Sequence, residues 1–117
     1  MYVRRIVVLA IAGMLAVSLS GFAQDAAKGK TLFSSVSPKC TMCHSAEGAG
    51  NAKNPLDGVG SKLSADDIKA WIRTPKEMAA KAKSEAKPPM QPYAKEKLSD
   101  ADMDAIVAYL MSLKAAK

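Results

Sequence analysis

The clearest periodicity of the chain lies near its C-terminus. Apolar residues recur there at steps of three and four, the spacing of one helix face: Met103, Ile106, Val107, Leu110 and Leu113. Ser99 precedes this stripe as an N-cap, with Asp102 three residues later, and acidic residues suit the positive end of the helix dipole. The pattern predicts a helix that is capped by Ser99 and buries its apolar face.

A second segment carries the same helix-start signal. Ser64 is followed by Asp67 at the third position, as Ser99 is by its aspartate. The helix is expected to run through Trp71 and to stop near Thr74, because Pro75 disfavours a helical conformation in the residue before it.

A short amphipathic helix is expected over residues 25–34, with Leu32 and Phe33 facing inward. Gly29 lies one turn before Phe33. Glycine in a helix costs about 1 kcal/mol relative to alanine. We therefore expect a close backbone contact at Gly29, with a merely tolerated glycine as the alternative.

The segments between these helices are richer in helix breakers. Residues 47–61 contain Gly, Asn and Pro and are expected to be irregular, whereas three prolines make residues 87–93 extended. β-Branched residues are sparse, and no stretch alternates apolar and polar residues long enough for a strand. The expected fold class is all-α.

Residues 1–23 have the layout of a secretory signal peptide. Two arginines precede an apolar run over residues 6–19, and small residues follow it up to Ala23. The run is shorter than the roughly 20 apolar residues of a membrane-spanning helix. We expect cleavage between Ala23 and Gln24 and an exported protein, with an uncleaved membrane anchor as the alternative.

The expected mature chain, residues 24–117, has room for one small domain. Its 94 residues would bury a limited apolar core, so another group is expected to add to it. Cleavage removes Arg4 and Arg5 from the 17 basic residues, which leaves 15 against 11 acidic ones and a net charge of +4. This excess, without a basic cluster interleaved with aromatics, favours docking on acidic protein surfaces over nucleic-acid binding.

The chemically informative stretch is residues 40–44, Cys-Thr-Met-Cys-His. Two thiols three residues apart can each add to a haem vinyl group, while the adjacent imidazole reaches the iron, and this pattern is typical of c-type haem attachment. Cys40 and Cys43 are the only cysteines and His44 is the only histidine. One covalent haem c would account for all three.

Three other interpretations of these residues are weaker. A Cys40–Cys43 disulfide would close a very short loop and constrain the unfolded chain little. A thioredoxin-like pair needs a strand and helix context that the sequence lacks. A structural zinc site would need a carboxylate as its fourth ligand beside the two thiols and His44.

The mature chain resembles class I cytochromes c, the small bacterial monohaem kind, from Gly29 and Phe33 through the Cys-x-x-Cys-His motif to Tyr109 and Leu110. The resemblance implies the cytochrome c fold, with three to four short helices around one covalently bound haem. It also implies that the first and last helices cross, with Tyr109 and Leu110 against Gly29 and Phe33.

The second axial ligand of such a haem is expected to be a methionine, because the chain has no second histidine. Met42 lies inside the attachment loop, and the methionines of the last helix pack as core. Met78 and Met90 remain. The proline-rich segment can hold Met90 at a fixed distance, and the family's ligand lies on such a loop, so Met90 is preferred, with Met78 as the alternative.

A metal-bound histidine normally donates its other ring N–H to a carbonyl or carboxylate. The family uses a proline carbonyl in a Pro-x-Leu-x-Gly turn, whereas residues 54–58 are Asn-Pro-Leu-Asp-Gly. This departure leaves Asn54 and Pro55 open as acceptors for His44. Trp71 is either a haem neighbour or a core residue, and Tyr93 either hydrogen-bonds near the Met90 segment or only packs there.

Histidine and methionine ligation would fill both axial positions and favour electron transfer over catalysis. The expected function is that of a periplasmic electron carrier without a small-molecule substrate, which reaches membranes only by docking to membrane complexes. Lysines near the Met90 segment are candidates for that docking: Lys76, Lys81, Lys83, Lys87, Lys95 and Lys97. The alternatives are a peroxidase or gas sensor with an open iron position, and a subunit of a larger redox complex.

Overall fold

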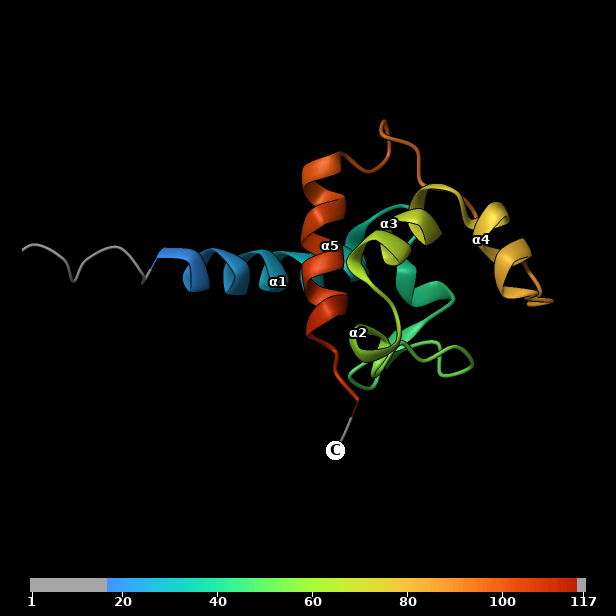
Figure 1. Ribbon diagram of the computed structural model, residues 1–117, viewed down its shortest axis with the longest axis horizontal. Helices are drawn as coiled ribbons and strands as arrows, with labels where there is room; N and C mark the ends of the chain where they lie inside the picture. The colour runs from blue at the N-terminus through green and yellow to red at the C-terminus, as the bar shows by residue number, and fades with distance from the viewer. Residues whose placement is uncertain (1–16, 116–117) are drawn as a thin grey trace, which may run out of the picture.

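The computed structural model describes the backbone of residues 17–115 and the side chains of residues 25–115. Its helices and strands, in chain order, are α1 (Val17–Ser35), the 3₁₀ turn η1 (Cys40–Met42), β1 (Ser45–Ala46), β2 (Ala49–Gly50), α2 (Val59–Lys62), α3 (Ala65–Arg73), α4 (Pro75–Ala82) and α5 (Asp100–Ser112). Helices dominate the described chain (Figure 1), so the expected all-α class is confirmed.

The two helix starts that were predicted from serine caps are confirmed. The Ser64 hydroxyl accepts a hydrogen bond from the Asp67 main-chain N–H at 3.1 Å. The Ser99 hydroxyl accepts the equivalent bond from Asp102 at 3.2 Å. Each cap satisfies a main-chain donor that the first helical turn leaves unpaired. Helix α3 ends as expected, with Thr74 as its C-cap.

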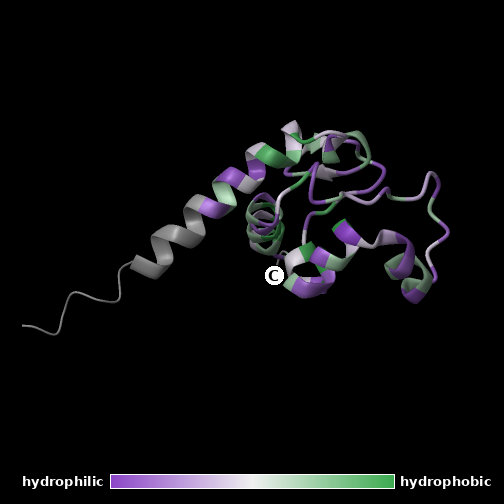
Figure 2. Cartoon of the chain, turned by 90° about the horizontal axis from the view of Figure 1, so that it is seen from above, coloured by the Kyte–Doolittle hydropathy of each residue, from purple (hydrophilic) through white to green (hydrophobic). Residues whose placement is uncertain are grey.

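The crossing of α1 and α5 organises the core (Figures 1 and 2). A Cβ atom built on Gly29 would lie only 1.9 Å from the carbonyl oxygen of Ala105, so a side chain there would collide with the backbone of α5. Next to this contact the rings of Phe33 and Tyr109 meet edge to face, with centroids 5.9 Å apart. The close contact expected at Gly29 and the approach of Tyr109 are confirmed, and Leu110 is buried in the same core.

Helix α1 begins earlier than expected, at Val17 rather than near residue 25, since no proline interrupts the chain there. Most of the expected signal segment lies outside the described residues, and the expected cleavage site after Ala23 falls within α1. Cleavage stays a prediction. Within residues 17–115, none of the helices combines the length and apolar character that crossing a bilayer requires.

The prediction that residues 47–61 are wholly irregular was wrong. Strands β1 and β2 form a hairpin with a two-residue turn. The turn residues, Glu47 and Gly48, both have positive φ angles, 51° and 81°. Helix α2 follows, and its Gly60 lies so close to α5 that a Cβ atom would be 2.3 Å from the Met111 carbonyl oxygen. Helix α2 is stabilised by this contact with α5, so the apolar periodicity of its own short sequence does not predict it.

As expected from its prolines, the stretch of residues 87–93 contains no helix, although the chain bends at residues 87 and 88. This stretch is part of the connection from α4 to α5, in which Tyr93 and Leu98 lie in the core and are 6% and 2% exposed. Trp71, in α3, is only half-buried and does not belong to the buried core cluster. The proline-rich chain therefore runs along the surface and enters the interior at Tyr93.

Candidate functional site

The two cysteines and the histidine share one tight turn. The main-chain N–H groups of Cys43 and His44 both donate to the Cys40 carbonyl, at 3.2 and 2.9 Å. The turn begins at Lys39, whose carbonyl accepts from the Met42 N–H at 3.1 Å. Cys40 and Cys43 are free thiols. The turn thus presents two free thiols and one imidazole from five consecutive residues.

The two thiols have different surroundings, because Cys40 is half-buried against the core and Cys43 is exposed. Burial raises the pKa of the Cys40 thiol, although a hydrogen bond with Tyr93, whose hydroxyl lies 4.0 Å from the sulfur, acts in the opposite direction. A redox-active cysteine pair of the thioredoxin kind requires a lowered thiol pKa. The environment of Cys40 is the opposite of that, which counts against this interpretation.

His44 is held by the main chain of the following loop. Its Nδ1 lies 3.2 Å from the carbonyl oxygen of Asn54. A carbonyl can only accept, so Nδ1 carries the proton and Nε2 keeps its lone pair for a metal. The acceptor is therefore Asn54, and Pro55 beside it forms a β-bridge with Ser45.

Two asparagine side chains fix the turn from outside: Asn51 was not anticipated from the sequence, and Asn54 was considered only as a main-chain acceptor for His44. The Asn51 amide donates to the Met42 carbonyl and the Asn54 amide to the Cys43 carbonyl, both at 3.1 Å. The main-chain N–H of Asn51 also donates to the His44 carbonyl at 3.1 Å. Asparagine side chains donate readily to main-chain carbonyls in loops, and the two asparagines that follow the motif were the available signal.

The candidate methionines differ in their environment. Met90 is half-buried and packs against the hydrophobic core from the extended segment. Met78 lies in α4 and is half-buried. Met42 is 64% exposed and Met103 is buried within α5. Of the two candidates, Met90 is the one packed on the core.

Tyr93 connects the Met90 segment to the attachment turn. Its hydroxyl donates to the carbonyl of Pro38, two residues before Cys40, and burial raises the pKa of this phenol above its usual range. Its main-chain N–H donates to the Ile72 carbonyl at 2.9 Å. Tyr93 therefore hydrogen-bonds as well as packs, and it places the segment that carries Met90 beside the turn that carries the thiols.

The donor set fits a haem c better than a bare metal ion. Among the described residues, no group of three or more His, Cys, Asp or Glu side chains is arranged to hold a metal, which counts against the zinc interpretation. Two free thiols in one turn, an imidazole with a defined tautomer and a core-facing thioether match the needs of a covalently attached haem.

Comparison with known proteins is consistent with this geometry. The sequence profile of the family described as Cytochrome c matches residues 26–114, which include the attachment turn, the Met90 segment and α5. Neither the curated proteins nor the solved structures contain a significant match. Proteins of this family transfer electrons through a haem, and the small size of the chain fits class I. With the match covering most of its length, the chain belongs to the cytochrome c family.

Proposed function

We propose that the chain is a one-electron carrier with a single haem c bound through Cys40 and Cys43 and ligated by His44 and Met90. The observation that carries the proposal is the hydrogen bond between His44 Nδ1 and the Asn54 carbonyl, 3.2 Å long. It selects the tautomer in which Nε2 is free to bind iron. A histidine with a merely structural role has no need of that arrangement beside two free thiols.

The two cysteines supply the covalent bonds. Each thiol adds across one vinyl group, so that its sulfur bonds to one vinyl carbon and its hydrogen passes to the other, and no oxidant is needed. The turn held by Asn51 and Asn54 keeps both sulfur atoms on a fixed frame during this addition.

Both axial positions are filled by the chain in this proposal. Bound haem supplies reversible one-electron chemistry at its iron, and a thioether ligand favours the ferrous state. His44 and Met90 leave no position at which a substrate can bind the metal. These features favour a carrier over a peroxidase or a gas sensor.

The proposed partners are redox proteins with acidic docking surfaces, met in the periplasm after export. The side chains near the Met90 segment that support this are exposed lysines: Lys76, Lys81, Lys83, Lys87, Lys95 and Lys97. Of these, Lys95 lies 3.4 Å from an Asp100 carboxylate oxygen. An excess of positive charge steers association with acidic partners and weakens with salt.

Optical spectroscopy tests the ligand assignment. The ferric holoprotein should show the weak far-red charge-transfer band of sulfur ligation to low-spin iron. Met90→Ala should abolish the band and admit carbon monoxide to the ferrous protein, whereas the matched variant Met78→Ala should keep the band. Loss of the band in Met78→Ala would move the assignment to Met78. A wild-type protein that lacks the band and binds carbon monoxide readily would contradict the carrier proposal.

A further inference from the structure

The Met90 segment, the chain that connects α4 to α5 over residues 83–99, has few attachments around Met90 itself. In the described part of the chain, residues 85–92 make only local hydrogen bonds, from Ala86 to the Ser84 hydroxyl and from the Gln91 amide to the Pro89 carbonyl. Prolines at three positions remove main-chain donors. Apart from Met90 these residues are exposed. The position of Met90 therefore depends on how the ends of the segment are held.

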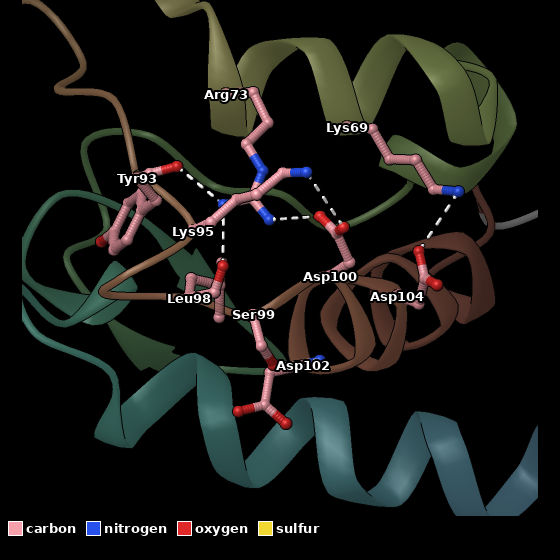
Figure 3. A network of polar contacts seen from close by, with 9 residues as sticks. All are labelled: Lys69, Arg73, Tyr93, Lys95, Leu98, Ser99, Asp100, Asp102 and Asp104. Atoms are coloured by element: carbon pink, nitrogen blue, oxygen red, sulfur yellow. Dashed lines mark hydrogen bonds and ion pairs between the residues drawn. The ribbon is translucent and has the colours of Figure 1, made fainter.

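The C-terminal end of the segment is held by Arg73, the last residue of α3 and the only arginine in residues 24–117. Its Nη1 donates to the carbonyls of both Tyr93 and Leu98, each at 2.8 Å (Figure 3). Its Nη2 donates to the Asp100 carboxylate, also at 2.8 Å. The side chain is 19% exposed, so these bonds are partly shielded from water. One guanidinium thus joins α3, the Met90 segment and the start of α5.

Tyr93 is fixed from two consecutive residues of α3. The Ile72 carbonyl accepts its main-chain N–H at 2.9 Å, and Arg73 donates to its carbonyl. Both polar groups of its peptide backbone are therefore bound to the end of α3. Met90 lies three residues upstream, a reach of about 10 Å for an extended chain. This is the nearest firm attachment to Met90 on its C-terminal side.

We propose that Arg73 is a positioning residue for Met90. By holding the Tyr93 and Leu98 carbonyls, it keeps the extended segment against α3 and so keeps the thioether at the iron. The proposal rests on the assignment of Met90 as the axial ligand. Among the described residues Arg73 makes no hydrogen bond with Met90, so in this proposal it acts through the main chain between residues 93 and 98.

Arginine suits this task because its planar guanidinium presents several N–H donors in a fixed arrangement. Here one nitrogen serves two carbonyls while the second engages Asp100. A lysine at the same position would bring a single flexible ammonium group, which loses more side-chain freedom for each bond formed.

The chain offers a matched control in Lys69. Its ammonium group lies 3.2 Å from Asp104, so this ion pair also joins α3 to α5 (Figure 3). It makes no hydrogen bond or ion pair with the described residues of the Met90 segment. A variant at Lys69 therefore removes a contact between the same two helices without touching the carbonyls that Arg73 holds.

Imidazole binding to the ferric holoprotein measures how readily Met90 leaves the iron. Imidazole must displace Met90, so its apparent dissociation constant falls as the displaced form becomes more populated. For Arg73→Gln we expect that constant to fall at least about tenfold, since two charged hydrogen bonds to the segment are lost. For Lys69→Gln we expect a change below about twofold, as usual for an exposed ion pair.

Hydrogen exchange supplies a readout that does not depend on the iron. The Tyr93 amide, bonded to Ile72, should exchange faster in Arg73→Gln than in wild type under native conditions. Urea unfolding of each variant, followed by circular dichroism, separates local release of the segment from a global loss of stability. A merely structural Arg73 would lower global stability and leave imidazole affinity as it is in Lys69→Gln.

The outcomes are distinct. A large gain in imidazole affinity for Arg73→Gln, with little change for Lys69→Gln, supports the proposal, and equal effects overturn it. If Arg73→Gln does not yield folded holoprotein, Arg73→Lys replaces it, with a gain of at least about threefold expected and wild-type affinity overturning the proposal. A Met90→Ala variant that keeps the far-red band refutes the ligand assignment itself, whatever the Arg73 variants do.

Discussion

The side chain of His44 and the main chain of Asn54 are joined by a hydrogen bond of 3.2 Å between Nδ1 and the carbonyl oxygen. The acceptor is a main-chain atom, so it is supplied by the fold of the loop and not by a particular side chain. The loop is tied to the attachment turn again where the Ser45 N–H donates to the same carbonyl at 3.2 Å. The orientation of the proposed iron ligand is therefore a property of the backbone.

Substitution of Asn54 separates these two roles. Asn54→Ala removes the amide that donates to the Cys43 carbonyl but keeps the carbonyl that orients His44. We expect a loss of about 1 kcal/mol in the free energy of unfolding, measured with urea. The far-red band and the reduction potential should stay at their wild-type values. A large change in potential would show that the side chain, and not the backbone, sets the ligand.

The crossing of α1 and α5 should be intolerant of any side chain at Gly29. In Gly29→Ala the new Cβ atom would meet the Ala105 carbonyl and the Cβ of Tyr109, 1.9 and 2.8 Å away. Two helices must then move apart, and we expect a cost of about 3 kcal/mol in the free energy of unfolding. The matched control is Ser34→Ala, on an exposed site of the same helix, which should change stability by less than about 0.5 kcal/mol. Equal stability of both variants would contradict the crossing.

The ion pair at Asp100 predicts an acid dependence of stability. Hydrogen bonds from Arg73 and Lys95 hold the pKa of the Asp100 carboxyl below its ordinary value. The folded state thus favours the ionised carboxylate. The stabilisation that this carboxylate gives is complete above the pKa of Asp100 in the unfolded chain. It is lost as the pH falls below about 4, through the lower pKa of the folded state. Asp100→Asn should therefore lose less stability than wild type between neutral and acid pH in urea titrations. Parallel losses in the two proteins would argue against this pair.

The haem is expected to be structural as well as functional, because a domain of this size buries little apolar surface by itself. The double variant Cys40→Ala, Cys43→Ala, which cannot attach haem, should be largely unfolded. Circular dichroism measures this as a loss of most of the helical signal. Native-like helicity in the double variant would show that the polypeptide core is sufficient.

Local signals were enough to predict several elements of the fold. The serine caps at Ser64 and Ser99 have partners within the next turn, so they depend on no distant part of the chain. Gly29 indicated a close contact because glycine destabilises a helix interior, so a glycine there needs a structural reason. Pro75 correctly predicts that α3 stops near Thr74, and it is also the first residue of α4, where proline is well tolerated because the first-turn N–H has no helical partner.

Contacts between distant segments could not be predicted in the same way. Arg73 bonds to carbonyls 20 and 25 residues away, and nothing in the spacing of these residues relates them. Helix α2 forms where Gly60 lies against the end of α5, a contact that local propensity does not describe. The choice between Asn54 and Pro55 also required the path of the loop, because either carbonyl was compatible with the sequence.

The most direct test of the account is the mass of the purified chain after denaturation. Protein exported from cells that carry the haem-attachment machinery should have the mass of the polypeptide plus one haem, and acidified acetone should not extract the haem. The double variant Cys40→Ala, Cys43→Ala should have the mass of the polypeptide alone. A wild-type chain that shows the bare polypeptide mass, or releases its haem into acidified acetone, would contradict the attachment at Cys40 and Cys43.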